Sequence, residues 1–111
     1  MSQMANSVGR QLAGRTALVT GSTRGIGLGI AQSLAADGAN VVLNGFGDEK
    51  AIEEIRQNIE QQYQVKAGFN GADLLDHEAI EKMMDDIQDE YGSLDILVNN
   101  VSTCLNFSNI H

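Results

Sequence analysis

Apolar residues recur along this chain in two patterns that alternate. Short runs rich in Val, Leu and Ala are typical of buried strands, and the segments between them repeat apolar residues at steps of three and four, as amphipathic helices do. Asp48 and Asp76 stand where they can cap the second and third helices, and Gly38 follows the first helix as a stop. The alternation predicts an α/β fold, with a parallel sheet built from βαβ units. The predicted strands are 16–20, 40–44, 65–70 and 95–99, and the predicted helices are 25–37 and the two segments that follow Asp48 and Asp76.

The length and composition fit a single domain. With 111 residues, of which 42% are hydrophobic and 20% charged, the chain can bury one core. We divide it into a leader over 1–12, a folded unit over 13–100 and an irregular tail over 101–111. No apolar run approaches the ~18 residues that a membrane helix needs, so no membrane partner is expected. A net charge of −8 argues against nucleic acid as a partner, because that binding depends on Lys and Arg contacts to phosphate.

The cysteine content and the first residues predict a cytoplasmic protein. Cys104 stands alone, so no disulfide can form within the chain and a reducing compartment is expected. The first residues lack the continuous apolar segment of a secretory signal. They include Arg10 and Arg15 but no acid, which leaves the mitochondrial matrix as the alternative location.

A glycine-rich loop joins the first strand to the first helix, where residues 16–27 read TALVTGSTRGIG. Gly21 can adopt the dihedrals of a sharp turn, Gly25 has no Cβ to hold a pyrophosphate away from the main chain, and Gly27 allows the helix to pack closely on the strand. The N–H groups and the positive dipole end of the helix would then face the phosphates. No acid precedes Asp37, so the loop lies in the least negative third of the chain. The candidate ligand-binding residues of the loop are Gly21, Ser22, Thr23, Arg24, Gly25, Ile26 and Gly27.

This loop resembles the cofactor turn of the short-chain dehydrogenase/reductase family, Thr-Gly-x-x-x-Gly-x-Gly, which matches Thr20 and the three glycines. Asp73-Leu74 after the third strand and Asn99-Asn100 after the fourth match further family positions, and the resemblance covers about residues 12–100. It implies a Rossmann-type sheet with strand order 3-2-1-4 and helices on both faces, truncated to β-α-β-α-β-α-β. It also implies that Asp73, followed by Leu74, meets the adenine ring of the cofactor, and that Asn99 and Asn100 stabilise the central strand beside it.

Within this family, residues 20–48 look most like the bacterial 3-hydroxybutyrate dehydrogenases, which exchange hydride between NAD and a short hydroxy acid. The resemblance therefore implies the N-terminal cofactor-binding part of an NAD(P)-dependent oxidoreductase. Its substrate would be a small hydroxy or keto compound such as 3-hydroxybutyrate or acetoacetate. Family members are usually homo-oligomers that assemble through helices beyond this segment.

The catalytic residues of the family have no counterpart in these 111 residues. Hydride transfer to a carbonyl leaves an alkoxide that must be protonated, and the family uses a Tyr followed four residues later by a Lys, with a Ser upstream. Tyr63 and Lys66 are three apart, and no lysine follows Tyr91. Residues 101–102 are Val-Ser where the family has Ala-Gly, which puts close approach to the nicotinamide ribose in doubt. We therefore assign no catalytic residue and expect an inactive fragment or truncated form.

Two further classes of function are weighed against this one. The first is a catalytically silent dinucleotide-binding module, or a partner of full-length family members. The second is a methyltransferase, which also places a glycine-rich loop after its first strand. The glycine spacing and the paired asparagines argue against the methyltransferase.

The end of the second strand bears on the choice of cofactor, because an acid there takes the ribose 2′-OH of NAD whereas a nearby Arg favours the 2′-phosphate of NADP. Asn44 is the candidate cofactor contact at this position, and it is neutral. Residues 45–47 add no positive charge, and Asp48 and Glu49 would repel an added phosphate. Arg24 argues in the other direction. The sequence therefore predicts NAD, with NADP as the alternative.

Other polar groups and the last strand have simpler interpretations. His77 and the acidic run over 85–90 are expected on solvated helix faces, so no metal is predicted. The fourth strand would lie at a sheet edge, and its apolar residues would then be incompletely covered. This predicts association of the chain through that edge.

Overall fold

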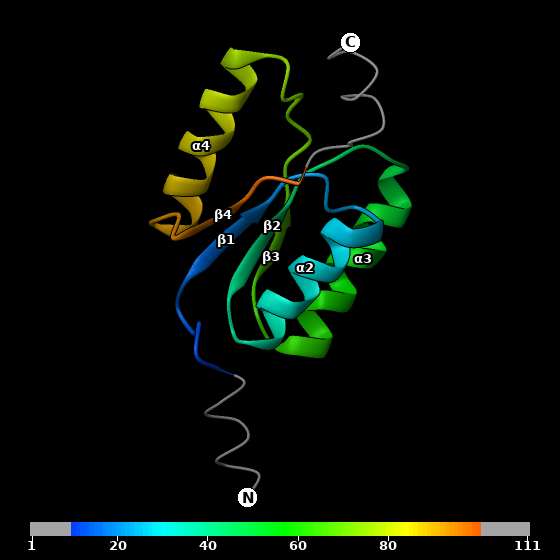
Figure 1. Ribbon diagram of the computed structural model, residues 1–111, viewed down its shortest axis with the longest axis vertical. Helices are drawn as coiled ribbons and strands as arrows, with labels where there is room; N and C mark the ends of the chain where they lie inside the picture. Colours follow the sequence, from blue (N-terminus) through cyan, green and yellow to red (C-terminus); the bar gives the residue numbers. More distant parts are fainter. Residues whose placement is uncertain (1–9, 101–111) are drawn as a thin grey trace, which may run out of the picture.

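The computed structural model describes residues 10–100. The tail over 101–111 and most of the leader, including Val101, Ser102 and Cys104, lie outside the described residues. The elements follow in the predicted order: β1 Thr16–Val19, α2 Gly25–Ala36, β2 Asn40–Leu43, α3 Glu49–Tyr63, β3 Ala67–Phe69, α4 His77–Tyr91 and β4 Ile96–Val98. The four strands are parallel and lie in the order β3-β2-β1-β4 (Figure 1), which confirms the predicted fold class and topology.

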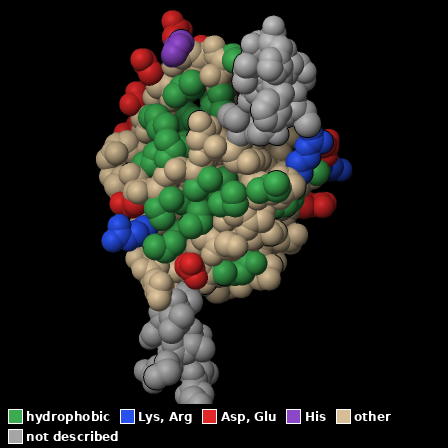
Figure 2. All heavy atoms as spheres, viewed as in Figure 1, with side chains coloured by type: hydrophobic (Ala, Val, Ile, Leu, Met, Phe, Trp, Pro, Cys, Tyr) green, Lys and Arg blue, Asp and Glu red, His purple; other side chains and the backbone are tan. Residues whose placement is uncertain are grey.

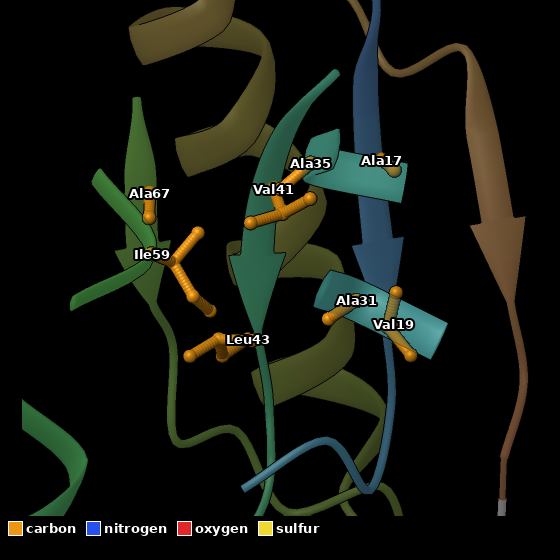
Figure 3. Packing of buried hydrophobic residues seen from close by; sticks show 8 residues of the cluster. All are labelled: Ala17, Val19, Ala31, Ala35, Val41, Leu43, Ile59 and Ala67. Atoms are coloured by element: carbon orange, nitrogen blue, oxygen red, sulfur yellow. The ribbon is translucent and has the colours of Figure 1, made fainter. Parts of the chain in front are cut away.

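The helices cover both faces of the sheet because successive strand residues point in opposite directions. Helices α2 and α3 lie on one face and α4 on the other (Figure 1). On the α2 and α3 side, strand side chains such as Val19, Val41 and Leu43 pack with Ala31 and Ile59 of the helices (Figure 3). The smaller core on the α4 side contains Leu18, Val42, Met83 and Ile87.

The short caps and stops that the sequence predicts are present. The carboxylates of Asp48 and Asp76 accept hydrogen bonds from backbone N–H groups in the first turns of α3 and α4. Gly38 follows the end of α2 with a φ of +101°. The two carboxylates satisfy backbone N–H groups that have no partner within the helix, and Gly38 adopts a conformation that ends the helix. Local chemistry therefore fixes where the helices begin and end.

The strands are shorter than predicted, by one residue at the carboxyl ends of β1 and β2, by two and one residues at the two ends of β3, and by one residue at each end of β4. The difference has a physical reason at the carboxyl ends of β1, β2 and β4. Thr20, Asn44 and Asn99 follow the last strand residues, and their side chains hydrogen-bond to neighbouring turns. Polar groups therefore gather where the strands end.

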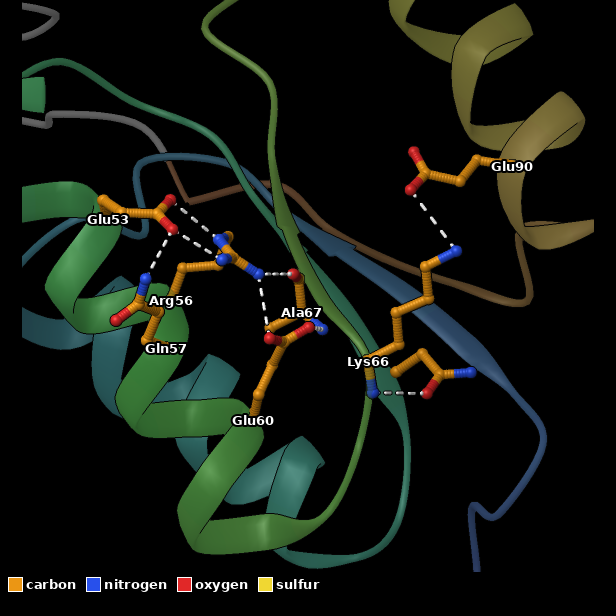
Figure 4. Close-up of polar contacts among 8 residues, drawn as sticks. Glu53, Arg56, Gln57, Glu60, Lys66, Ala67 and Glu90 are labelled. Carbon is orange, nitrogen blue, oxygen red and sulfur yellow. Dashed lines mark hydrogen bonds and ion pairs between the residues drawn. The ribbon is translucent and has the colours of Figure 1, made fainter.

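Side chains of α3 bind the backbone of Ala67 at the outer edge of β3 (Figure 4). The Ala67 N–H donates to Oε2 of Glu60 at 3.0 Å, and the Ala67 carbonyl accepts from Nη1 of Arg56 at 3.0 Å. Arg56 also pairs with Glu53 at 2.6 Å and with Glu60 at 2.9 Å. The hydrogen bond from Arg56 is the main cause that lowers the pKa of Glu53 to about 2. Helix α3 thus satisfies the backbone N–H and carbonyl of one residue, Ala67, on the side of β3 that faces away from β2.

The opposite edge of the sheet is formed by β4, which exposes an apolar side chain. Within residues 10–100, β4 pairs with β1 alone, and Leu97 is 55% exposed. Figure 2 shows hydrophobic side chains gathered on the face of the molecule along which β1 and β4 run. The exposure of Leu97 agrees with the expected incomplete cover of the fourth strand, and association through it stays a prediction.

The end of α4 packs against β3 with a polar atom that has no partner. Among residues 10–100, the Tyr91 hydroxyl is the buried side-chain group without a hydrogen bond. It lies so close to β3 that a Cβ on Gly68 would sit 2.6 Å from the hydroxyl oxygen. Burial, followed by the charges of Glu90 and Glu60, raises the pKa of Tyr91 to about 12. The ring stabilises the fold by packing against the core on the α4 side, whereas the hydroxyl lowers stability because it is removed from water without gaining a hydrogen bond.

We expect Tyr91→Phe to leave the free energy of unfolding unchanged or raise it by about 1 kcal/mol, since it removes an unpaired buried hydroxyl. Above pH 10 the unfolded tyrosine ionises, while the folded one keeps its proton until the pH approaches about 12. Wild-type stability should therefore fall as pH rises through this window, and the advantage of Tyr91→Phe should grow. Urea unfolding between pH 8 and pH 11.5 measures both effects, with Tyr63→Phe as control. A clear loss of stability in Tyr91→Phe at neutral pH would show that the hydroxyl has a partner.

Candidate functional site

The loop between β1 and α2 is a tight turn that needs glycine at specific positions. Gly21 has a φ of +59° and Gly25 a φ of +61°, in the left-handed region that favours glycine. A Cβ on Gly27 would lie 2.0 Å from the Gly21 carbonyl oxygen, and one on Gly21 would lie 2.3 Å from the Asn100 carbonyl oxygen. Apart from its chain neighbours and the adjacent backbone of α2, nothing in the described structure lies within 4 Å of the place of a Cβ on Gly25. Two of the glycines therefore serve close backbone packing, and Gly25 borders open space.

The amino terminus of α2 differs from those of α3 and α4. The latter two are capped by Asp48 and Asp76 and carry Glu49 and Glu78 in their first turns. The N-cap of α2 is Arg24, whose side chain makes no capping hydrogen bond, and the first turn of α2 has no acid. The positive end of the α2 dipole, with its N–H groups, is thus left without the negative partners that the other helices have. Such a terminus suits an anion.

Hydrogen bonds fix this turn to the end of β4. The Thr20 hydroxyl donates to Oδ1 of Asn99 at 3.0 Å and accepts from the Asn100 N–H at 2.8 Å. The Asn100 side-chain amide donates to the Gly21 carbonyl at 3.1 Å. The structure therefore brings the paired asparagines to the start of the turn, where they hold the central strand to its neighbour.

On its other side the turn is fixed to the end of β2. The buried Ser22 hydroxyl donates to the Val19 carbonyl at 2.6 Å and accepts from the Asn44 N–H at 3.0 Å. The Ser22 N–H donates to the Asn44 carbonyl at 2.7 Å, and the Thr23 hydroxyl donates to the Phe46 carbonyl at 2.8 Å. Ser22 is inaccessible to solvent, so its contacts are to the protein itself.

Asn44 is directed into the protein. Its side chain is buried and donates to the carbonyls of Asn70 and Ala72, both at 3.0 Å. The sequence predicted that this residue faces the cofactor, and a contact between Asn44 and a ribose stays a prediction. What the structure shows is an internal bond from β2 to the loop after β3.

That loop carries the remaining predicted residues. Asp73 is exposed, and its Oδ1 accepts from the Leu75 N–H at 2.9 Å, while Leu74 is half-buried against the α4 side of the core. Arg24 and Ile26 are exposed beside the turn, and Ile26 keeps 79% of its surface. In a parallel sheet the carboxyl ends of all strands lie on the same side, so all of these predicted residues lie at the carboxyl ends of the strands.

The described residues fit the phosphates of a nucleotide. The space beside Gly25 is open, the helix terminus above it is uncapped, and the nearest charged side chain of the turn is the cation Arg24. In residues 10–100 no group of three or more His, Cys, Asp or Glu side chains is placed to hold a metal ion. No helix in this part of the chain is long and apolar enough to cross a membrane.

One tyrosine and one lysine do meet, although the sequence separates them. Nζ of Lys66 lies 4.5 Å from the ring centroid of Tyr91 and 3.3 Å from the Glu90 carboxylate. Lys66 directly precedes β3, so this pair lies near the amino-terminal ends of the strands, whereas the glycine turn lies at the carboxyl ends. A proton donor near neutral pH needs a lowered pKa, whereas burial raises that of Tyr91. The contact between Lys66 and Tyr91 is therefore a packing contact.

A glycine-to-alanine series separates packing from conformation in the turn. Gly27→Ala should destabilise the fold most, because its Cβ would overlap the Gly21 carbonyl. Gly25→Ala should cost about 1–2 kcal/mol, the strain of a left-handed alanine. Gly29→Ala is the control in the same helix, and it should stabilise by about 0.5–1 kcal/mol because its Cβ meets nothing. Urea unfolding of the three variants checks this order, and equal losses at Gly25 and Gly27 would contradict it.

Comparisons with known proteins give matches over most of the chain. A sequence model of the short chain dehydrogenase family matches residues 15–111. D-beta-hydroxybutyrate dehydrogenase of Cupriavidus necator is 53% identical over 90 residues, which cover 80% of this chain and 34% of that protein. The chain spans about a third of the length of the curated relatives it matches.

Solved structures share the fold of this chain. A dehydrogenase/reductase from Sinorhizobium meliloti 1021 superimposes with a TM-score of 0.78 at 39% identity, over 92% of this chain and 39% of that one. L-sorbose reductase from Gluconobacter frateurii, complexed with NADPH and L-sorbose, gives a TM-score of 0.75 at 30% identity, over 82% of this chain and 34% of that one.

Proposed function

Because this chain belongs to the short-chain dehydrogenase family, we propose that it forms the N-terminal cofactor-binding part of an NAD(P)-dependent oxidoreductase. The observation that carries the proposal is the uncapped terminus of α2 above the open space at Gly25. The pyrophosphate would accept hydrogen bonds from the first-turn N–H groups, as anions do at helix termini. Residues Gly21 to Gly27 would surround it, and Asp73 and Leu74 would meet the adenine ring.

We propose a small hydroxy or keto compound as the substrate of the complete enzyme, with 3-hydroxybutyrate and acetoacetate as the pair to test first. Support comes from the 53% identity to the Cupriavidus necator dehydrogenase. The nicotinamide cofactor, when bound, supplies the hydride. The residues of this chain hold and orient the cofactor, whereas the proton for the alkoxide must come from a residue outside the described part.

We propose NAD as the cofactor, with NADP as the alternative. The turn after β2 holds no positive charge, and Asp48 and Glu49 follow it. Arg24 stands beside the phosphate end of the site, and we assign it to the pyrophosphate. The NADPH bound by the L-sorbose reductase keeps the alternative open within the family.

Calorimetric titration of the 111-residue chain with NADH and NADPH tests the proposal. We expect saturable binding that is tighter for NADH. Arg24→Ala should weaken both by the same factor of about two to five, the effect of one exposed ion pair, and Arg15→Ala at the other end of β1 should change neither. A folded chain that binds no dinucleotide would exclude the proposal. A selective loss of NADPH affinity in Arg24→Ala would assign Arg24 to the 2′-phosphate.

We also propose that the chain by itself does not turn over 3-hydroxybutyrate, because no tyrosine in it precedes a lysine by four positions. A catalytically silent module, or a partner of full-length family members, is the alternative. The coding region downstream distinguishes the two: a continuation with Tyr-x-x-x-Lys supports the oxidoreductase, and its absence from every reading frame favours the silent module. NADH formation by the chain would contradict both.

A further inference from the structure

Asn44 occupies the end of β2, where sequence reasoning places a cofactor contact, yet its amide is committed to the protein. The side chain is 2% exposed, and its nitrogen donates to the carbonyls of Asn70 and Ala72, both at 3.0 Å. An amide nitrogen carries two hydrogens, so both are used in these bonds. The nitrogen also lies 3.9 Å from the sulfur of Met83 in α4.

The backbone of Asn44 makes a second set of bonds in the opposite direction. Its N–H donates to the Ser22 hydroxyl at 3.0 Å, and its carbonyl accepts from the Ser22 N–H at 2.7 Å. Ser22 stands between Gly21 and Gly25 in the glycine turn. One residue therefore connects the turn after β1 with the loop after β3, through main chain on one side and side chain on the other.

The loop after β3 packs Ala72 and Leu74 against the core on the α4 side, but it also borders a hollow at residues 70–72. A hollow of about 280 Å³ separates residues 70–72 from Ala79 and Lys82 of the helix. At its far end the loop is held to the start of α4, where the Asp73 carbonyl accepts from the Asp76 N–H and Oδ1 of Asp73 accepts from the Leu75 N–H, both at 2.9 Å. Residues 70–72 are otherwise held by the bond from the Asn70 N–H to the Leu43 carbonyl at 2.9 Å, and by the bond from the Ala72 N–H to Oδ1 of Asn70 at 3.0 Å. Both of these bonds fix Asn70 and its own turn, so Asn44 is the link that orients the carbonyl of Ala72, next to Asp73.

We propose that Asn44 is a positioning residue, which sets the adenine-side loop at 70–74 relative to the phosphate-binding turn at 21–27, in place of a contact to the ribose. The inference rests on the proposed function for its consequence in binding. Its structural part needs no cofactor. An aspartate at this position would present oxygen to two carbonyl oxygens and could not replace the two donated bonds.

Asn44→Asp separates the two roles, because they predict opposite results. An acid that faced the ribose would keep or strengthen NADH binding through the 2′-OH. A positioning amide replaced by a carboxylate should weaken NADH binding at least about tenfold, through loss of two buried hydrogen bonds. Asn40→Asp is the matched control at the other end of β2, where the side chain accepts a bond from the Lys66 N–H that a carboxylate can also accept.

Hydrogen exchange of the free chain supplies a readout that is independent of the cofactor. We expect faster amide exchange over 70–76 in Asn44→Asp and in the milder Asn44→Ala, with exchange in α3 unchanged and with Asn40→Asp like wild type. Equal or tighter NADH binding by Asn44→Asp, or unchanged exchange over 70–76, would overturn the positioning role. Loss of the helical circular dichroism in both Asn44 variants would also overturn it, since the amide would then be needed by the whole fold.

The two proposals fail in different ways. If the wild-type chain binds no dinucleotide, the proposed function fails, and the exchange experiment still decides whether Asn44 holds the loop. If the chain binds NADH and Asn44→Asp binds it equally well, only the positioning role fails.

Discussion

The structure depends on the hydrogen bonds that fix the turn after β1 to the ends of the two neighbouring strands. β1 lies between β2 and β4, so its turn can be held on both sides. Thr20 bonds to the end of β4 and Ser22 to the end of β2. A turn with two left-handed glycines would be costly to order alone, and these buried bonds make one conformation favourable. The position of the α2 terminus follows from them.

Charge is distributed along the chain in a way that matches this architecture. Acidic side chains neutralise the amino termini of α3 and α4, where they act as caps. The amino terminus of the first helix, α2, has no acidic side chain beside it, because no acid precedes Asp37 in the sequence. A net charge of −8 is therefore compatible with an anionic ligand, since the negative groups are concentrated in other elements.

The element order and the caps could be predicted because they follow from local chemistry: apolar spacing, Asp48, Asp76 and glycine stops. The strand order came from the resemblance to the family. The resemblance also placed the glycine turn and the paired asparagines together at the carboxyl ends of the strands, where the structure has them. The direction of the Asn44 side chain could not be predicted, because its partners lie 26 and 28 residues further along the chain. The approach of Lys66 to Tyr91 was equally hidden, since it depends on how α4 packs against β3. The signal that could have pointed to Asn44 was a polar residue directly after the apolar run of β2.

The hydrogen bonds from Arg56 and to Glu60 at Ala67 affect where another strand could join the sheet. An added strand must find free N–H and carbonyl groups along an edge, and on the β3 side these groups of Ala67 already have partners from α3. Within residues 10–100, the strand at the other side is β4, which pairs with β1 alone. At Ala67, therefore, α3 occupies the backbone groups that a strand added next to β3 would need, whereas β4 has only one neighbouring strand among the described residues.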